Sequence, residues 1–208
     1  MRNLLAGLML VVVIIAGCSS EEDELGDFYN AFQETVEVEK EIEPLTEEFN
    51  SLEEEKSELQ QSLEDASRDE LPDISDQLVE NTDSRIEQLD AEVSVMEDSR
   101  NAMESSRQYV EEISNESYKE KAQSLIDSME SRFTAHEEMI SSYKSVLEGE
   151  KEVFEYLGGE DISQDEVDQR LNSLNEEYQT VEDNTSAFSE ETDKVNEIKQ
   201  EIEELVQR

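Results

Sequence analysis

Residues 126–157 read IDSMESRFTAHEEMISSYKSVLEGEKEVFEYL, and this stretch decides the fold. Apolar and aromatic side chains recur along it in steps of three and four residues, with only Glu150 out of character. This spacing places one stripe of side chains on a single face of a helix and predicts a buried seam of coiled-coil type. The seam residues are Ile126, Met129, Phe133, His136, Ile140, Tyr143, Leu147, Phe154 and Leu157.

The same spacing recurs in three other runs, over residues 28–63, 78–113 and 167–205. In the first run Lys56 fills a gap in the apolar register, and in the second run arginines are interspersed. The second seam is predicted to comprise Leu78, Ile86, Leu89, Val93, Met96, Met103, Val110 and Ile113. A highly charged chain can be disordered, but a regular apolar repeat together with only six Gly and two Pro favours helices.

Breaks near Pro72, Asn115 and Gly158 would divide the chain into four helices of about forty residues, each about 60 Å long at 1.5 Å per residue. Equal lengths favour an all-α, elongated, antiparallel up-and-down four-helix bundle with coiled-coil-like seams. Without the break at Asn115 the middle helix would be twice as long as its neighbours. An extended three-helix rod is therefore the alternative fold.

Local signals mark several helix ends. Pro44 lacks a backbone N–H and predicts a kink or a helix start inside the first run. Ser114 and Asn115 are residue types that cap helix N-termini, which favours a turn there over a continuous rod. Ser163 and Glu166 match a capping box, in which each side chain bonds the other residue's backbone N–H.

The N-terminus has the features of a lipoprotein precursor. Arg2 precedes an uncharged apolar stretch that is too short to span a bilayer and that ends in Ile15-Ala16-Gly17-Cys18. We expect residues 1–17 to be a cleaved signal peptide and Cys18, the single cysteine, to carry a covalent diacylglycerol. Residues 18–24 are then a lipid-anchored acidic linker, and residues 25–208 the helical bundle domain.

The formal charge of −42 argues against nucleic acid as a partner, because phosphate binding depends on Lys and Arg. No stretch has the alternating oxygen ligands and central Gly of a Ca²⁺ loop, so only weak, diffuse cation binding is expected. With one histidine and the cysteine committed to lipid, neither a Cys/His dyad nor a His-based zinc site can form. We predict that the protein is not an enzyme and has no cofactor other than the lipid.

Three residues are candidate contacts for a ligand or partner: His136, Tyr143 and Tyr156. Tyrosines can form an aromatic platform for sugars, but at helical spacing they are more often seam residues with a hydrated hydroxyl. His136 lies at a seam position between Phe133 and Ile140. The favoured interpretation of His136 is a partly buried imidazole bonded to a neighbouring carboxylate, and a ligand contact is the alternative.

The segment MESRFTAHE at 129–137, followed by Tyr143-Lys144, by EVFEYL at 152–157 and by NEEY at 175–178, resembles the YkyA-type cell-wall-binding lipoproteins of Gram-positive bacteria. The resemblance extends to the layout of nearly the whole chain, from the lipid-attachment motif to the last helix. It implies a four-helical up-and-down bundle, a lipid anchor and a location facing the wall. It supplies no catalytic residues.

The sequence therefore predicts a lipid-anchored, extracytoplasmic, cell-wall-binding lipoprotein that acts as a non-catalytic helical interaction module between membrane and wall. The expected partners are the membrane, through the anchor, and peptidoglycan, another wall component or an envelope protein. With few lysines, the chain lacks the basic patch that could contact an anionic wall. The alternative function is a helical bundle of the envelope that binds a small ligand or cations.

Overall fold

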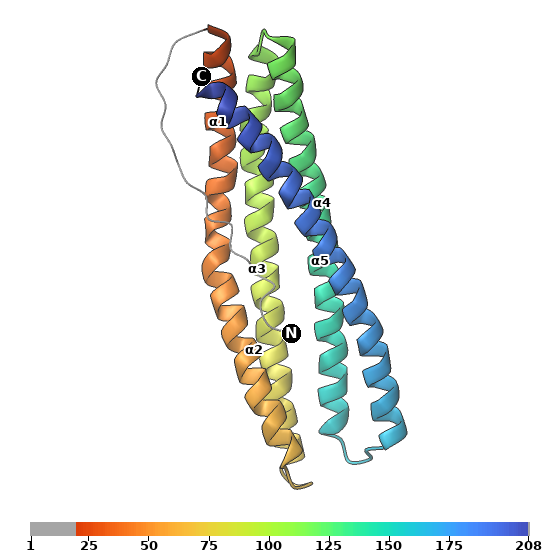
Figure 1. Cartoon of the computed structure of the whole chain (residues 1–208). Helices are drawn as coiled ribbons and strands as arrows, with labels where there is room; N and C mark the ends of the chain where they lie inside the picture. Colours follow the sequence, from red (N-terminus) through yellow and green to blue (C-terminus); the bar gives the residue numbers. More distant parts are fainter. Residues whose placement is uncertain (1–19, 208) are drawn as a thin grey trace. The chain divides into compact units, whose positions relative to one another are not determined.

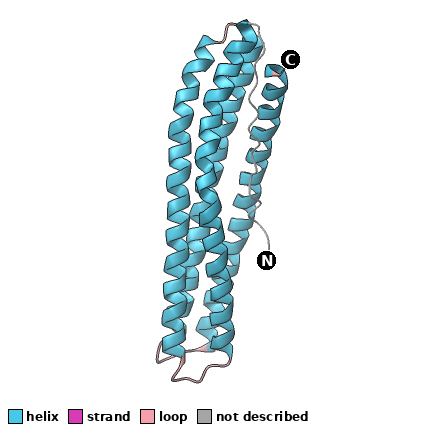
Figure 2. Cartoon of the chain, turned by 90° about the vertical axis from the view of Figure 1, so that its left-hand side faces the viewer, coloured by secondary structure: helices cyan, strands magenta, loops and turns pink. Residues whose placement is uncertain are grey.

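The computed structural model describes residues 20–207, so the predicted signal peptide and Cys18 lie outside the described residues. This part is almost entirely helical and contains no strand (Figure 1). The helices are joined by short loops (Figure 2). They are α1 (Ser20–Val38), the 3₁₀ helix η1 (Glu39–Glu41), α2 (Ile42–Glu64), α3 (Leu71–Glu112), α4 (Glu116–Leu157) and α5 (Gln164–Val206).

The four helical stretches run antiparallel to their neighbours in sequence, as α3 and α4 illustrate. Lys144 and Lys151 of α4 pair with Asp90 and Asp83 of α3, so residue numbers rise along one helix as they fall along the other. α1, η1 and α2 together take the place of the first of the four predicted helices. The prediction of an all-α, antiparallel four-helix fold is confirmed, and the turn between α3 and α4 excludes the three-helix rod.

The chain forms two compact units, and each takes one segment from every one of the four helical stretches. The described residues of unit 1 are 20–43, 94–135 and 187–207, and unit 2 contains 44–93 and 136–186. α3, α4 and α5 contribute to both units, so each long helix contains two packing environments.

Unit 1 has the larger apolar core. Phe28 and Phe32 of α1 are fully buried, with ring centroids 6.2 Å apart. Burying a side chain of this size stabilises a fold by about 1.5–3 kcal/mol, so this cluster dominates the stability of the unit. Its buried members are Leu25, Phe28, Tyr29, Phe32, Val36, Met96, Met103, Val110, Ile113, Ala122, Leu125, Ile126, Met129, Phe133, Val195 and Ile202.

The turn between α3 and α4 is built from capping contacts. The Asn115 side-chain oxygen accepts hydrogen bonds from the backbone N–H groups of Ser117, at 3.0 Å, and Tyr118, at 3.3 Å. The predicted cap at this break is therefore confirmed. The turn also holds the start of α1, since Glu24 accepts a hydrogen bond from the Ser114 backbone N–H at 2.7 Å.

The predicted boundary between the acidic linker, residues 18–24, and the helical domain is wrong. α1 begins at Ser20, and Glu21 accepts a hydrogen bond from the Asn115 side-chain amide at 3.1 Å. Residues 20–24 are thus part of the helix rather than a linker preceding the domain. The acidic side chains in this first turn suit the partial positive charge of a helix N-terminus.

Two other local predictions had different outcomes. α-Helical structure is interrupted by η1, and α2 begins two residues before Pro44, as the proline predicted. The predicted capping box does not form, because the backbone N–H of Ser163 donates to the Tyr156 hydroxyl at 2.8 Å. Glu166 instead pairs with Arg170 at 2.9 Å, one turn further along α5.

In unit 2 the predicted seam of α3 is partly wrong. Leu89 is buried as predicted, but Ile86 and Val93 are only partly buried. The buried positions on either side of Leu89 belong to Arg85 and Glu92. Ile86 and Val93 also lie three and four residues from Leu89, so the spacing allows either face to be buried. The face that packs in unit 2 is the one with Arg85 and Glu92.

Candidate functional site: a buried ring of charges

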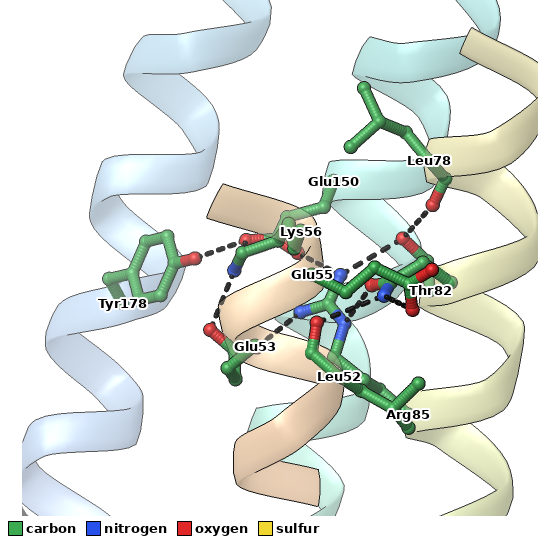
Figure 3. Close-up of polar contacts among 10 residues, drawn as sticks. Leu52, Glu53, Glu55, Lys56, Leu78, Thr82, Arg85, Glu150 and Tyr178 are labelled. Carbon is green, nitrogen blue, oxygen red and sulfur yellow. Dashed lines mark hydrogen bonds and ion pairs between the residues drawn. The ribbon is translucent and has the colours of Figure 1, made fainter. Parts of the chain in front are cut away.

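The most unusual feature of unit 2 is Arg85, whose side chain is 0% exposed. It belongs to a closed ring of four alternating charges that we call the charge ring: Glu53 and Lys56 of α2, Arg85 of α3 and Glu150 of α4 (Figure 3). Arg85 lies 2.6 Å from Glu53 and 2.7 Å from Glu150. Lys56 closes the ring at 2.9 Å from Glu53 and 3.1 Å from Glu150.

The other donors of Arg85 are satisfied by its own helix. Its Nε donates to the Asn81 side-chain oxygen and its Nη2 to the Thr82 hydroxyl, both at 3.0 Å. Thr82 donates in turn to the Leu78 carbonyl at 2.8 Å, and the Asn81 amide donates to the Leu52 carbonyl of α2 at 2.9 Å. A buried guanidinium is tolerated only when its N–H groups find such partners.

α5 reaches the ring through Tyr178, whose hydroxyl donates to Glu150 at 2.5 Å. Burial acts to raise the pKa of the Glu150 carboxyl, but Lys56, Arg85 and the Tyr178 hydroxyl outweigh it and lower that pKa. Burial, with the charge of Glu150 second, raises the pKa of the Tyr178 hydroxyl well above its usual range. Glu150 is therefore an ionised acceptor and Tyr178 a neutral donor.

The charge ring is formally neutral and joins α2, α3 and α4, and Tyr178 connects α5 to it. Because removing ions from water is expensive, a buried pair adds little net stability over an apolar pair of the same volume. A misplaced partner, however, leaves an uncompensated buried charge. The arrangement therefore selects one register of α2, α3, α4 and α5 and rejects others.

Unit 1 contains a second polar cluster of the same kind. Arg132 of α4 holds both carboxylate oxygens of Glu39 in η1, at 2.7 and 2.9 Å. Ser99 of α3 donates to the same carboxylate at 2.9 Å. α5 contributes the Thr192 hydroxyl, which accepts from Arg132 at 3.1 Å, and the Phe188 ring, 5.1 Å from the guanidinium carbon.

Each predicted contact residue has a partner within the chain. His136 is 1% exposed, and its Nε2 lies 2.9 Å from Glu92, which confirms the interpretation as a buried imidazole beside a carboxylate. Tyr143 packs edge-on against Phe49, with ring centroids 5.6 Å apart. Burial, followed by the charge of Glu53, raises the pKa of Tyr143 to about 12.

Tyr156 lies at the opposite end of the α4 segment of unit 2. Its hydroxyl accepts from the Ser163 N–H and donates to the Asp161 carbonyl at 3.3 Å, so it holds the turn into α5. Along α4, thirteen residues separate Tyr156 from Tyr143, about 20 Å at 1.5 Å per residue. The structure therefore does not bring His136, Tyr143 and Tyr156 together in one site.

Two features of the sequence point to the charge ring only when they are considered together. Glu150 interrupts the best seam, and Lys56 fills a gap in another seam. Opposite charges at seam positions of two different helices indicate a buried ion pair, because each charge needs compensation there. The partnership with Arg85 could not be found in this way, because the predicted α3 seam passed through Ile86.

The described residues offer one sizeable surface depression in unit 2, a shallow and open hollow of about 490 Å³. Its lining is Glu137, Glu138, Ser141, Ser142, Thr180 and Asn184. Within residues 20–207, no group of three or more His, Cys, Asp or Glu side chains is arranged to hold a metal ion. In the same part of the chain, no helix has the length and apolarity needed to cross a membrane.

A family model named YkyA, described as "Putative cell-wall binding lipoprotein", matches residues 23–205. The chain belongs to the YkyA family. The resemblance found in the sequence is thereby confirmed, and the match includes part or all of every helix. As a coarse description, this YkyA-family protein is a member of a lipoprotein family with a helical-bundle fold.

Two individual proteins are similar to this YkyA-family protein. One is the "Uncharacterized lipoprotein YkyA" of Bacillus subtilis (strain 168), 28% identical over 90 residues, which are 43% of this chain and 40% of that protein. The other is a conserved protein of unknown function from Staphylococcus aureus, whose crystal structure superposes with a TM-score of 0.77. That match covers 90% of this chain and 97% of the other at 18% identity, and it shows the fold alone.

Proposed function

We propose that this protein is a lipid-anchored, non-catalytic interaction module on the outer face of the cell membrane, facing the wall. The observation that carries the proposal is the family match over residues 23–205. The Ile15-Ala16-Gly17-Cys18 motif after an uncharged apolar stretch supports the lipid anchor. Cys18 lies outside the described residues, so the anchor rests on the sequence.

Binding by the outer faces of the helices fits the described part best. The charge ring and the Arg132 cluster are satisfied by internal partners, and so is each predicted contact residue. A wall polymer or partner protein would therefore contact the exposed helix surfaces. Small-ligand or cation binding remains the alternative, and the hollow lined by Glu137 and Glu138 would be its place.

The surface charge determines which conditions would allow wall contact. In residues 20–207, twelve Lys and Arg side chains form ion pairs with carboxylates, so their positive charge is largely compensated within the chain. A chain of charge −42 and an anionic wall repel each other at low ionic strength. Screening shortens this repulsion to about 8 Å at physiological salt, and divalent cations can bridge carboxylates to phosphates.

The test is retention of residues 19–208 on purified wall sacculi across a Mg²⁺ series and a NaCl series matched in ionic strength. We expect retention to rise with salt, and to rise more with Mg²⁺ if cations bridge the two surfaces. Chelation should then release the Mg²⁺-dependent fraction. An unrelated acidic protein of similar size is the control. Absence of retention under every condition would refute wall binding and direct the search to a protein partner.

A further inference from the structure

Burial is distributed unevenly in unit 2. α4 supplies much of the apolar interior, whereas residues 164–186 of α5, which we call the α5 strap, supply one buried side chain, Val181. Leu171 of the strap is 42% exposed. The buried hydrophobic residues of the facing α4 segment are Met139, Ile140, Val146, Leu147, Val153 and Phe154.

The strap is held to α4 mainly by polar contacts. Tyr178 donates to Glu150 of the charge ring, and the Asn184 amide donates to the Glu138 carbonyl at 3.2 Å. Near the turn, the Arg170 guanidinium carbon lies 4.9 Å from the centre of the Tyr156 ring. Regions with few buried apolar contacts have a small free energy of local opening, so they open more often than the core of the protein.

Charge opposes the docking of the strap. It has seven acidic residues and one basic residue, a net charge of −6, and residues 136–157 of α4 have six acidic and two basic residues, a net charge of −4. The acidic residues are Asp165, Glu166, Asp168, Glu176, Glu177, Glu182 and Asp183 on the strap, and Glu137, Glu138, Glu148, Glu150, Glu152 and Glu155 on α4. Two like-charged helices packed side by side repel each other, and salt weakens that repulsion.

Like charges of the two helices meet near Gly149, where side chains of the strap lie close to the α4 backbone. A Cβ added at Gly149 would lie 3.0 Å from the Glu177 carboxylate and 3.1 Å from Leu174, so the strap packs directly over the α4 backbone there. Burial, followed by the charges of Glu152 and Glu148, raises the pKa of the Glu177 carboxyl. Deprotonated Glu177 therefore works against docking.

We propose that the α5 strap detaches reversibly from α4 while α3 and α4 stay folded, and that ionic strength controls this opening. Low salt favours the open state because the excess carboxylates of the strap and of α4, beyond the Arg170–Glu152 pair and Glu150 in the charge ring, then repel with the least screening. High salt favours the docked state, because the hydrogen bond from Tyr178 to the buried Glu150 is little affected by screening. This proposal does not depend on wall binding.

Hydrogen–deuterium exchange of the purified protein, read by mass spectrometry at about 20 mM and about 500 mM NaCl, tests the proposal. At low salt we expect backbone amides of residues 170–186 to exchange much faster than those of residues 78–93 in α3. High salt should slow exchange in the strap by a factor of about three, the scale of exposed charge interactions, and leave α3 unchanged. Equal protection of the two segments at low salt, or a strap insensitive to salt, would overturn the proposal.

A pair of charge-neutralising variants separates local repulsion from net charge. Glu177→Gln removes the carboxylate that faces α4, and Glu176→Gln removes an exposed neighbour with the same change in net charge. We expect Glu177→Gln alone to slow exchange in the strap about twofold to fivefold at low salt. An equal response of both variants would contradict the assignment of the repulsion to Glu177. Unchanged circular dichroism in both variants would show that the fold is retained.

Discussion

Arg85 occupies a position in α3 where an apolar side chain would normally pack, yet its guanidinium stays charged in proteins. Removing it would leave Glu53 and Glu150 with Lys56 as their only cationic partner in the ring. Breaking a buried ion pair by deleting one partner costs about 3–5 kcal/mol. We therefore expect Arg85→Ala to lower the free energy of unfolding by about that amount, measured by urea denaturation and circular dichroism.

An exposed ion pair in the same unit provides the control. Lys144 bonds Asp90 between α4 and α3, but these side chains are 33% and 58% exposed. Such pairs contribute about 0–1 kcal/mol, so Lys144→Ala should barely move the urea midpoint. Equal effects of the two substitutions would mean that burial does not determine the role of the charge ring.

Element boundaries can be tested at Asn115, the N-cap of α4. Its side-chain oxygen accepts two backbone N–H groups that have no partner within the helix. Replacing an N-cap Asn by Ala costs about 1 kcal/mol, so Asn115→Ala should lower the melting temperature by a few degrees in a thermal scan. Asn101→Ala makes the same change at an exposed position inside α3, where Ala is the better helix former, and no loss is expected there. A loss of equal size at Asn101 would argue against the capping role.

For the helices, the sequence predicted the positions of the breaks more reliably than the capping contacts at their ends. Pro44, Asn115 and Gly158 each lie within a few residues of an observed boundary, because such residues act through their own backbone or local side-chain bonds. The capping box at Ser163 failed because a residue from the preceding helix, Tyr156, reached the same N–H. A local sequence pattern gives no information on side chains from another helix that bond the same N–H. For the same reason, the sequence placed Lys56 and Glu150 in seams but could not pair them with Arg85.

For the molecule as a whole, the breaks near Pro72, Asn115 and Gly158 predicted the four helical stretches, whereas the uniform apolar repeat gave no indication of the two units. Unit 1 is closed largely by apolar side chains, whereas in unit 2 the charge ring and Tyr178 together join the four segments. The repeat has nearly the same spacing in both units, so periodicity alone cannot distinguish them. The two units differ in the type of residue at their seam positions. This difference can be recognised only when the pairings between helices are known.

The proposed lipid anchor can be tested at Cys18. A single acyl chain binds membranes only weakly, and stable anchoring requires two, which the diacylglycerol proposed on Cys18 would supply. We expect Cys18→Ala to move the protein from the membrane fraction to the soluble fraction on cell fractionation, with the helical content of the released protein unchanged. Ser19→Ala, which alters the adjacent residue and keeps the thiol, should remain in the membrane fraction and carry the lipid by mass spectrometry. If Cys18→Ala stayed with the membrane, the anchor would have to be a different segment or a membrane partner, and the acidic bundle would be held there by binding rather than by lipid.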